Sequence, residues 1–221
     1  MQYLFSIIFI CICNCLCAQN FSAQYSVEST REVQLASGKT EFVKLNYRGY
    51  LYKSGNRYIS FFKPLFLQEW ENGVVKVADG FSVSVSTDTV QALSYLDLDS
   101  NIVRTRTDFG GLNKVRKFDP GIIKWQIMPD TKIINGLPCQ KALLDFNGKT
   151  NLCEVWFCSD INVSVSLRNL PGLPGLLVEA DYYSANEKYQ LLSYNLGEDL
   201  PPSIFWPREF NQPFMEKKTG K

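Results

Sequence analysis

Apolar and polar residues alternate along most of this chain. Between Ala23 and Leu35 most odd positions are apolar and the even positions are polar, which is the two-residue period of a half-buried strand. The alternation recurs in later segments, which are separated by turn-forming pairs such as Asn72-Gly73 and Asp79-Gly80. No segment of ten or more residues has a clear 3.6-residue apolar period. The pattern predicts a succession of antiparallel β-hairpins.

The dipeptide Asn147-Gly148 is the strongest local turn signal. A type I′ turn needs positive φ at both central positions, and these two residue types tolerate it. We therefore predict a hairpin that joins the segments 136–146 and 149–158. A two-residue turn with continuous register places Cys139 opposite Trp156.

Two other regions depart from the strand pattern. Residues 109–130 contain several glycines and two prolines, and we expect a long irregular loop there with at most one helical turn. Prolines recur in the tail, residues 201–221, which therefore cannot join a central strand. Residues 19–200 are expected to form a single, mainly β domain built on an antiparallel sheet, with little helix.

The composition narrows the classes of function. The 221 residues include no His, which excludes Ser-His-Asp or Cys-His catalysis and His-ligated metal sites. Lys and Arg number 23 against 22 Asp and Glu, and a net charge of +1 argues against a nucleic-acid partner. We expect no cofactor and no metal. Hydrophobic residues make up 45% of the chain, enough for a large buried core.

The first 18 residues are predicted to be a signal peptide. The apolar run from Tyr3 to Ala18 suits a secretory signal and is shorter than the roughly 20 residues of a spanning helix. We therefore expect an exported protein, periplasmic or secreted, with no integral membrane span after cleavage. A lipoprotein anchor at Cys15 or Cys17 is the weaker alternative, because Asn14 and Leu16 are poor residues before an acylated cysteine.

Three cysteines remain after the predicted cleavage: Cys139, Cys153 and Cys158. The predicted register places Cys139 and Cys158 on one face of the hairpin, on a diagonal, and Cys153 on the other face. An exported protein is exposed to oxidising conditions, so a disulfide between Cys139 and Cys158 is one alternative. Three separate thiols are the other.

Two Pro-Gly pairs stand back to back near the end of the domain. Each Pro presets φ for the first turn position and each Gly supplies positive φ at the second, so we predict two type II turns that lead into a buried strand. The motif comprises Leu170, Pro171, Gly172, Leu173, Pro174, Gly175, Leu176 and the acidic Glu179.

At this string the chain resembles the GLPGLI family of uncharacterised exported bacterial proteins. Two upstream blocks, residues 139–142 (Cys-Gln-Lys-Ala) and 156–161 (Trp-Phe-Cys-Ser-Asp-Ile), are also similar to that family. The chain departs from it at Val163–Arg168, where members often carry Gly-Pro. The resemblance implies export and assigns no catalytic residues.

A weaker likeness, to the strongly curved, unclosed sheets of periplasmic lipoprotein carriers, suggests a half-barrel with an apolar concave face. The first functional hypothesis is therefore a non-enzymatic protein that binds an apolar or peptide ligand, or an envelope protein partner, in an apolar groove. The second is a structural or interaction module without a ligand. The third is a carboxylate-dependent hydrolase using Glu179 and Asp181, which share one face of a predicted strand.

Overall fold

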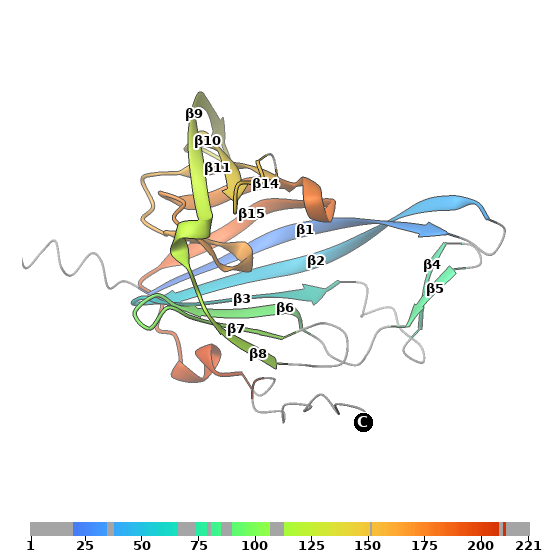
Figure 1. The fold of residues 1–221 in the computed structure, drawn as a ribbon, viewed down its shortest axis with the longest axis horizontal. Coiled ribbons are helices and arrows are strands. Elements are labelled where there is room, and N and C mark those ends of the chain that lie inside the picture. Colours follow the sequence, from blue (N-terminus) through green and yellow to red (C-terminus); the bar gives the residue numbers. More distant parts are fainter. Residues whose placement is uncertain are drawn as a thin grey trace, which may run out of the picture.

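The computed structural model describes residues 20–34, 38–65, 74–78, 81–84, 90–106, 113–150, 152–207 and 210. The predicted signal peptide and residues 211–221 lie outside this part. The described part is mainly β, and eleven strands form one large antiparallel sheet in the order β8-β7-β6-β3-β2-β1-β15-β14-β11-β10-β9 (Figure 1). The predicted fold class is confirmed.

The strands of this sheet have the following bounds: β1 Phe21–Gln34, β2 Thr40–Ser54, β3 Arg57–Pro64, β6 Gln91–Asp97, β7 Ile102–Arg106, β8 Asn113–Lys117, β9 Ile123–Ile134, β10 Leu137–Phe146, β11 Cys153–Cys158, β14 Leu176–Tyr182 and β15 Glu187–Leu196. Two small sheets are formed by β4 Val74–Ala78 with β5 Phe81–Ser84 and by β12 Val165–Ser166 with β13 Leu170–Pro171. Short 3-10 helices are η2 Pro120–Ile122, η3 Leu167–Asn169, η4 Tyr183–Ala185 and η5 Pro202–Phe205.

The sheet is strongly curved but does not close. Its edge strands, β8 and β9, are consecutive in the chain and are joined only by residues 118–122. That connection spans at most about 22 Å, whereas eleven flat strands would be about 48 Å wide. The two edges must therefore approach each other, and in Figure 1 the β9–β10 hairpin stands steeply to β1, β2 and β3. The ladder order pairs neither edge with the other.

The core lies on one face of the sheet, under the segment that contains most of the Pro-Gly motif. Residues 159–175, between β11 and β14, carry Val163, Leu167 and Leu173 into a cluster with Tyr25 and Phe157, all of them buried. This segment fills the space that a half-barrel would leave for a ligand. The interior of the curve is therefore a packed core.

The region predicted as a long loop, residues 109–130, is more regular than expected. Residues 113–117 form strand β8, and β9 begins at Ile123. Pro120 begins the short helix η2, and Pro129 lies within β9. Because β9 is an edge strand, a missing backbone N–H can be tolerated there, and the proline signal was misleading.

The start of the predicted tail packs onto the sheet. Phe205 in η5 and Phe210 are buried with Leu200, Ile59 and Leu93 in a second apolar cluster. The packed part of the chain thus extends past residue 200, while none of these tail residues joins the large sheet. Among the described residues, no helix is long and apolar enough to cross a membrane.

Candidate functional site

Four neighbouring strands, β11, β14, β15 and β1, place polar side chains in register on the sheet face opposite the core. Alternate residues of these strands are buried, so the residues between them point outward. Cross-strand pairing arranges the outward residues in two adjacent rows. The first row is Trp156, Glu179, Gln190 and Ser26, and the second row is Glu154, Asp181, Lys188 and Glu28.

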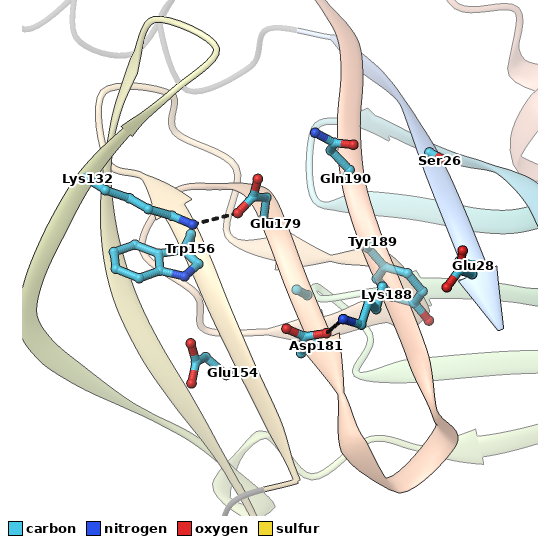
Figure 2. A pocket seen from close by; sticks show the side chains of 11 residues that line it. Ser26, Glu28, Lys132, Glu154, Trp156, Glu179, Asp181, Lys188, Tyr189 and Gln190 are labelled. Carbon is cyan, nitrogen blue, oxygen red and sulfur yellow. Dashed lines mark hydrogen bonds and ion pairs between the residues drawn. The ribbon is translucent and has the colours of Figure 1, made fainter. Parts of the chain in front are cut away.

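The two rows line a hollow with a volume of about 630 Å³, to which Lys132, Ala180 and Tyr189 also contribute (Figure 2). We call it the charged hollow, because its side chains include four carboxylates and two ammonium groups. The first functional hypothesis expected an apolar groove instead. The difference arises because the apolar side of the sheet is covered by residues 159–175, so that the polar side is the one left open.

Each carboxylate of the charged hollow is paired with a lysine. The nitrogen–oxygen distances are 3.0 Å for Lys44–Glu28, 2.9 Å for Lys141–Glu154, 2.7 Å for Lys132–Glu179 and 3.7 Å for Lys188–Asp181. All eight side chains are partly exposed, and such pairs contribute only about 0–1 kcal/mol each to stability. A ligand can therefore replace a lysine at little cost to the fold.

Trp156 lies at the end of the first row, close to two ammonium groups. The Nζ of Lys132 is 4.3 Å from the centre of a Trp156 ring, and the Nζ of Lys141 is 6.0 Å away. Both distances are within reach of a cation–π interaction. The ring thus provides a flat apolar surface inside a polar hollow, and Figure 2 shows Lys132 reaching past it to Glu179.

The contact between Lys132 and Glu179 joins two strands that are not neighbours in the sheet. Lys132 is on β9, and Glu179 is on β14, with β10 and β11 between them. On a flat sheet these strands would be about 14 Å apart. Residues 128–130 interrupt the pairing of β9 with β10, and Lys132 follows this irregularity. No sequence signal identified Lys132, because a contact across two intervening strands is not a local property.

Glu179 and Asp181 occupy the positions that strand alternation predicted, since both line the charged hollow. Glu154 joins them from β11 as the cross-strand partner of Asp181. The sequence reasoning did not single out Glu154 or Trp156 as site residues. The alternation within β11, which buries Cys153 and Val155 and leaves Glu154 and Trp156 partly exposed, was the available signal.

The leucines that follow the two prolines of the Pro-Gly motif pack in the core. Leu173, Leu176 and Leu177 are almost completely buried. Gly172 has φ +89°, as a type II turn requires. The second predicted type II turn is wrong, because Gly175 has φ +159° rather than a value near +80°. Pro171 accepts a hydrogen bond from the indole of Trp125 in β9 at 2.9 Å, which ties the motif to the sheet edge.

The predicted Asn147-Gly148 turn is present, with φ of 52° and 76°. The register predicted beyond it is wrong, because Lys141, and not Cys139, pairs with Trp156. The bridge next to the turn is isolated, and β11 begins only at Cys153, so pairing resumes two positions out of step. The two residues of a turn do not specify an irregularity in the strand that follows them.

The three cysteines are buried free thiols in this structure. Burial, and next the nearby Cys158, raise the pKa of Cys139 to about 11, and burial also raises the pKa of Cys153. Thiols held in this way are poor nucleophiles at neutral pH. Cys139 and Cys158 interact with each other, whereas Cys153 lies near Tyr182. Their pairing as a disulfide stays a prediction.

An ion pair between the partly exposed Arg168 and the buried Glu187 supports the segment that crosses the core. Arg168 donates two hydrogen bonds from Nη2 to Glu187, at 2.6 and 2.7 Å, and one from Nε to the Tyr189 hydroxyl at 2.7 Å. The Glu187 carboxylate is only 4% exposed. Arg168 therefore ties the segment that crosses the core to β15.

Comparison with known proteins gives a fold likeness only. No family model and no curated protein matches this chain. Among solved structures, PNGF-II in a C2 crystal form matches with a TM-score of 0.50 over 91% of this chain, and a P21 form with 0.51 over 85%. The identity is 13% in both cases, and the match covers 31% and 30% of the PNGF-II chain. This chain therefore spans about a third of that protein.

Proposed function

We propose that this chain is an exported binding protein that holds a polar peptide segment, of a free peptide or of an envelope protein partner, in the charged hollow. The observation that carries the proposal is the in-register placement of carboxylates, ammonium groups, an amide and Trp156 around one hollow of about 630 Å³. Export rests on the predicted signal peptide. Membership of the GLPGLI family is part of the same proposal and rests on the three sequence blocks.

The lining of the hollow favours a polar ligand over an apolar one. Apolar binding sites are lined mainly by hydrophobic side chains with a few polar groups. Here the proportions are reversed, and Trp156 is the main apolar surface among charged neighbours. A peptide matches this mixture, because its backbone and side chains offer donors, acceptors, charges and apolar groups within a short length.

The contacts of the carboxylates favour binding over hydrolysis. A glycosidase-type mechanism needs one carboxyl group that donates a proton to the leaving group. Glu179 instead accepts a hydrogen bond from Lys132 at 2.7 Å, and Asp181 faces Lys188 at 3.7 Å. The chain also has no His to act as an acid or base. Hydrolysis is therefore an alternative for the test to exclude.

The test is native mass spectrometry of the mature protein purified from the envelope of its native host. We expect an extra mass that is lost on denaturation and that fragments as a peptide, or a co-purifying protein. The double variant Glu179→Gln, Asp181→Asn should lose it. The matched control, Glu41→Gln, removes a carboxylate that pairs with Lys39 at 3.1 Å outside the hollow and should retain it.

Two outcomes would contradict the proposal. A bare polypeptide mass for both the wild-type protein and the Glu41→Gln control would exclude a tightly held ligand and favour a structural module. Release of sugars from a glycan mixture, lost in the double variant, would assign the same carboxylates to hydrolysis.

A further inference from the structure

We infer that Trp156 and Glu179 form a subsite for a basic side chain of the ligand, and that Lys132 occupies this subsite in the free protein. The inference rests on the proposed function and names the chemistry that the charged hollow recognises. Lys132 Nζ lies 2.7 Å from the Glu179 carboxylate and 4.3 Å from the Trp156 ring centre. A carboxylate on one side and an aromatic face on the other is how proteins hold an ammonium or guanidinium group.

Lys132 differs from the other three lysines that pair with these carboxylates in the position of its strand. Lys188 and Lys141 lie on strands next to those of their carboxylates, and Lys44 lies on β2, next to β1. Lys132 reaches across two intervening strands from the sheet edge. Its strand is paired on one side only and is interrupted at residues 128–130. The side chain can therefore leave Glu179 without disturbing the strands that hold the subsite.

The exposure of the contact supports an exchange. The Lys132 side chain is 39% exposed and that of Glu179 is 30% exposed. Solvent therefore reaches both partners, and a cation from outside can approach the same atoms. A guanidinium group gains more than an ammonium here, because it stacks on an aromatic face and bonds a carboxylate with two N–H groups.

Charge balance adds a second requirement on the ligand. Each of the four carboxylates of the hollow forms an ion pair with one lysine, so the four pairs together carry no net charge. A ligand cation that replaces Lys132 leaves one ammonium group without its carboxylate. An acidic group on the ligand, either a side chain or the C-terminal carboxylate, would pair with the released Lys132. The ligand class is therefore a peptide with a basic residue close to an acidic group.

The experiment removes the internal occupant and supplies a cation from outside. The Lys132→Ala variant and the wild-type protein are titrated with acetyl-Gly-Arg-Gly-amide, followed by the NMR shift of the Trp156 indole N–H. We expect the variant to bind the arginine peptide about tenfold more tightly than the wild-type protein, since Glu179 and the ring face are then free. The neutral peptide acetyl-Gly-Gln-Gly-amide should show no such gain.

Matched variants separate the subsite from a general charge effect. Lys188→Ala also removes one lysine from the hollow but releases Asp181 instead of Glu179, and it should give no gain. Adding Glu179→Gln to Lys132→Ala should abolish the gain. Circular dichroism and thermal unfolding confirm that each variant is folded, which the exposure of these side chains leads us to expect.

A second titration tests the charge requirement, with acetyl-Gly-Arg-Asp-Gly-amide on the wild-type protein. This peptide should bind more tightly than the arginine peptide, and the difference should disappear in Lys132→Ala. Equal binding of the arginine and glutamine peptides to Lys132→Ala would overturn the subsite. In that case native mass spectrometry could still show a peptide bound to the wild-type protein and absent from the Glu179→Gln, Asp181→Asn variant. The proposed function would then stand without this subsite.

Discussion

Gly175 lies so close to Cys158 that a Cβ atom on Gly175 would stand 2.2 Å from the carbonyl oxygen of Cys158. It would also lie 2.7 Å from the carbonyl carbon of Cys158 and 2.9 Å from the Cα of Ser159. All three atoms belong to the backbone, which cannot move aside as the end of a long side chain can. Glycine is required here by close approach, and this contact joins the end of β11 to the start of β14.

The Gly175→Ala variant should therefore be severely destabilised. We expect a loss of about 3 kcal/mol or more in the free energy of unfolding, or failure to fold. The control is Gly148→Ala, which has open space around the added Cβ and costs only about 1 kcal/mol through its positive φ. Urea unfolding of both variants measures the difference. Equal losses would show that the Gly175 contact is not tight.

Replacing Arg168 by Met should destabilise the protein by about 3 kcal/mol, because it leaves the buried Glu187 carboxylate without its guanidinium partner. The double variant Arg168→Met, Glu187→Met should lose less than the sum of the two single variants, since it removes both charges. Denaturant unfolding of the three variants gives the coupling energy. If the losses in the free energy of unfolding were additive, the pair would not stabilise the segment that crosses the core.

The stability of the reduced protein should fall as the pH rises from about 9 to about 11. Burial raises the pKa of Cys139 to about 11 from its ordinary value of 9.0, and burial also raises the pKa of Tyr25 and Tyr182. A raised pKa means that the unfolded chain releases these protons first, so this stability is full below pH 9 and is lost above it.

Urea midpoints measured with a reductant between pH 7.5 and 10.5 test this pH dependence. The Cys139→Ala variant should show a shallower decline than the wild-type protein, because one of the buried groups is gone. A wild-type midpoint that stays constant or rises over this range would contradict the assignment.

A mild thiol oxidant should join Cys139 to Cys158 in preference to Cys153. The last ladder pair of β10 and β11 is Gln140 with Phe157, so Cys139 and Cys158 are the next positions along each strand. Cross-strand neighbours lie within the Cα separation of a disulfide. Peptide mapping after diamide treatment identifies the product. A bridge that contains Cys153 would contradict the placement of the three thiols.

Much of the local structure was determined by the sequence alone. The two-residue period identifies strands that are buried on one side, because successive side chains of a strand point to opposite faces. For the same reason it placed Glu179 and Asp181 together on the open face of β14. Asn147-Gly148 specified its own turn, because the required positive φ is a property of those two residues.

Only the tertiary structure decided which face stayed open and what was brought to it. Residues 159–175 cover the apolar face through packing between segments far apart in the chain, so the expected apolar groove became a core. The two-position shift before β11 set the register of Trp156. The order of the strands, with the interruption in β9, placed Lys132 within reach of Glu179 on β14. Register shifts and strand order arise from the packing of all the strands together, and no short stretch of residues encodes them.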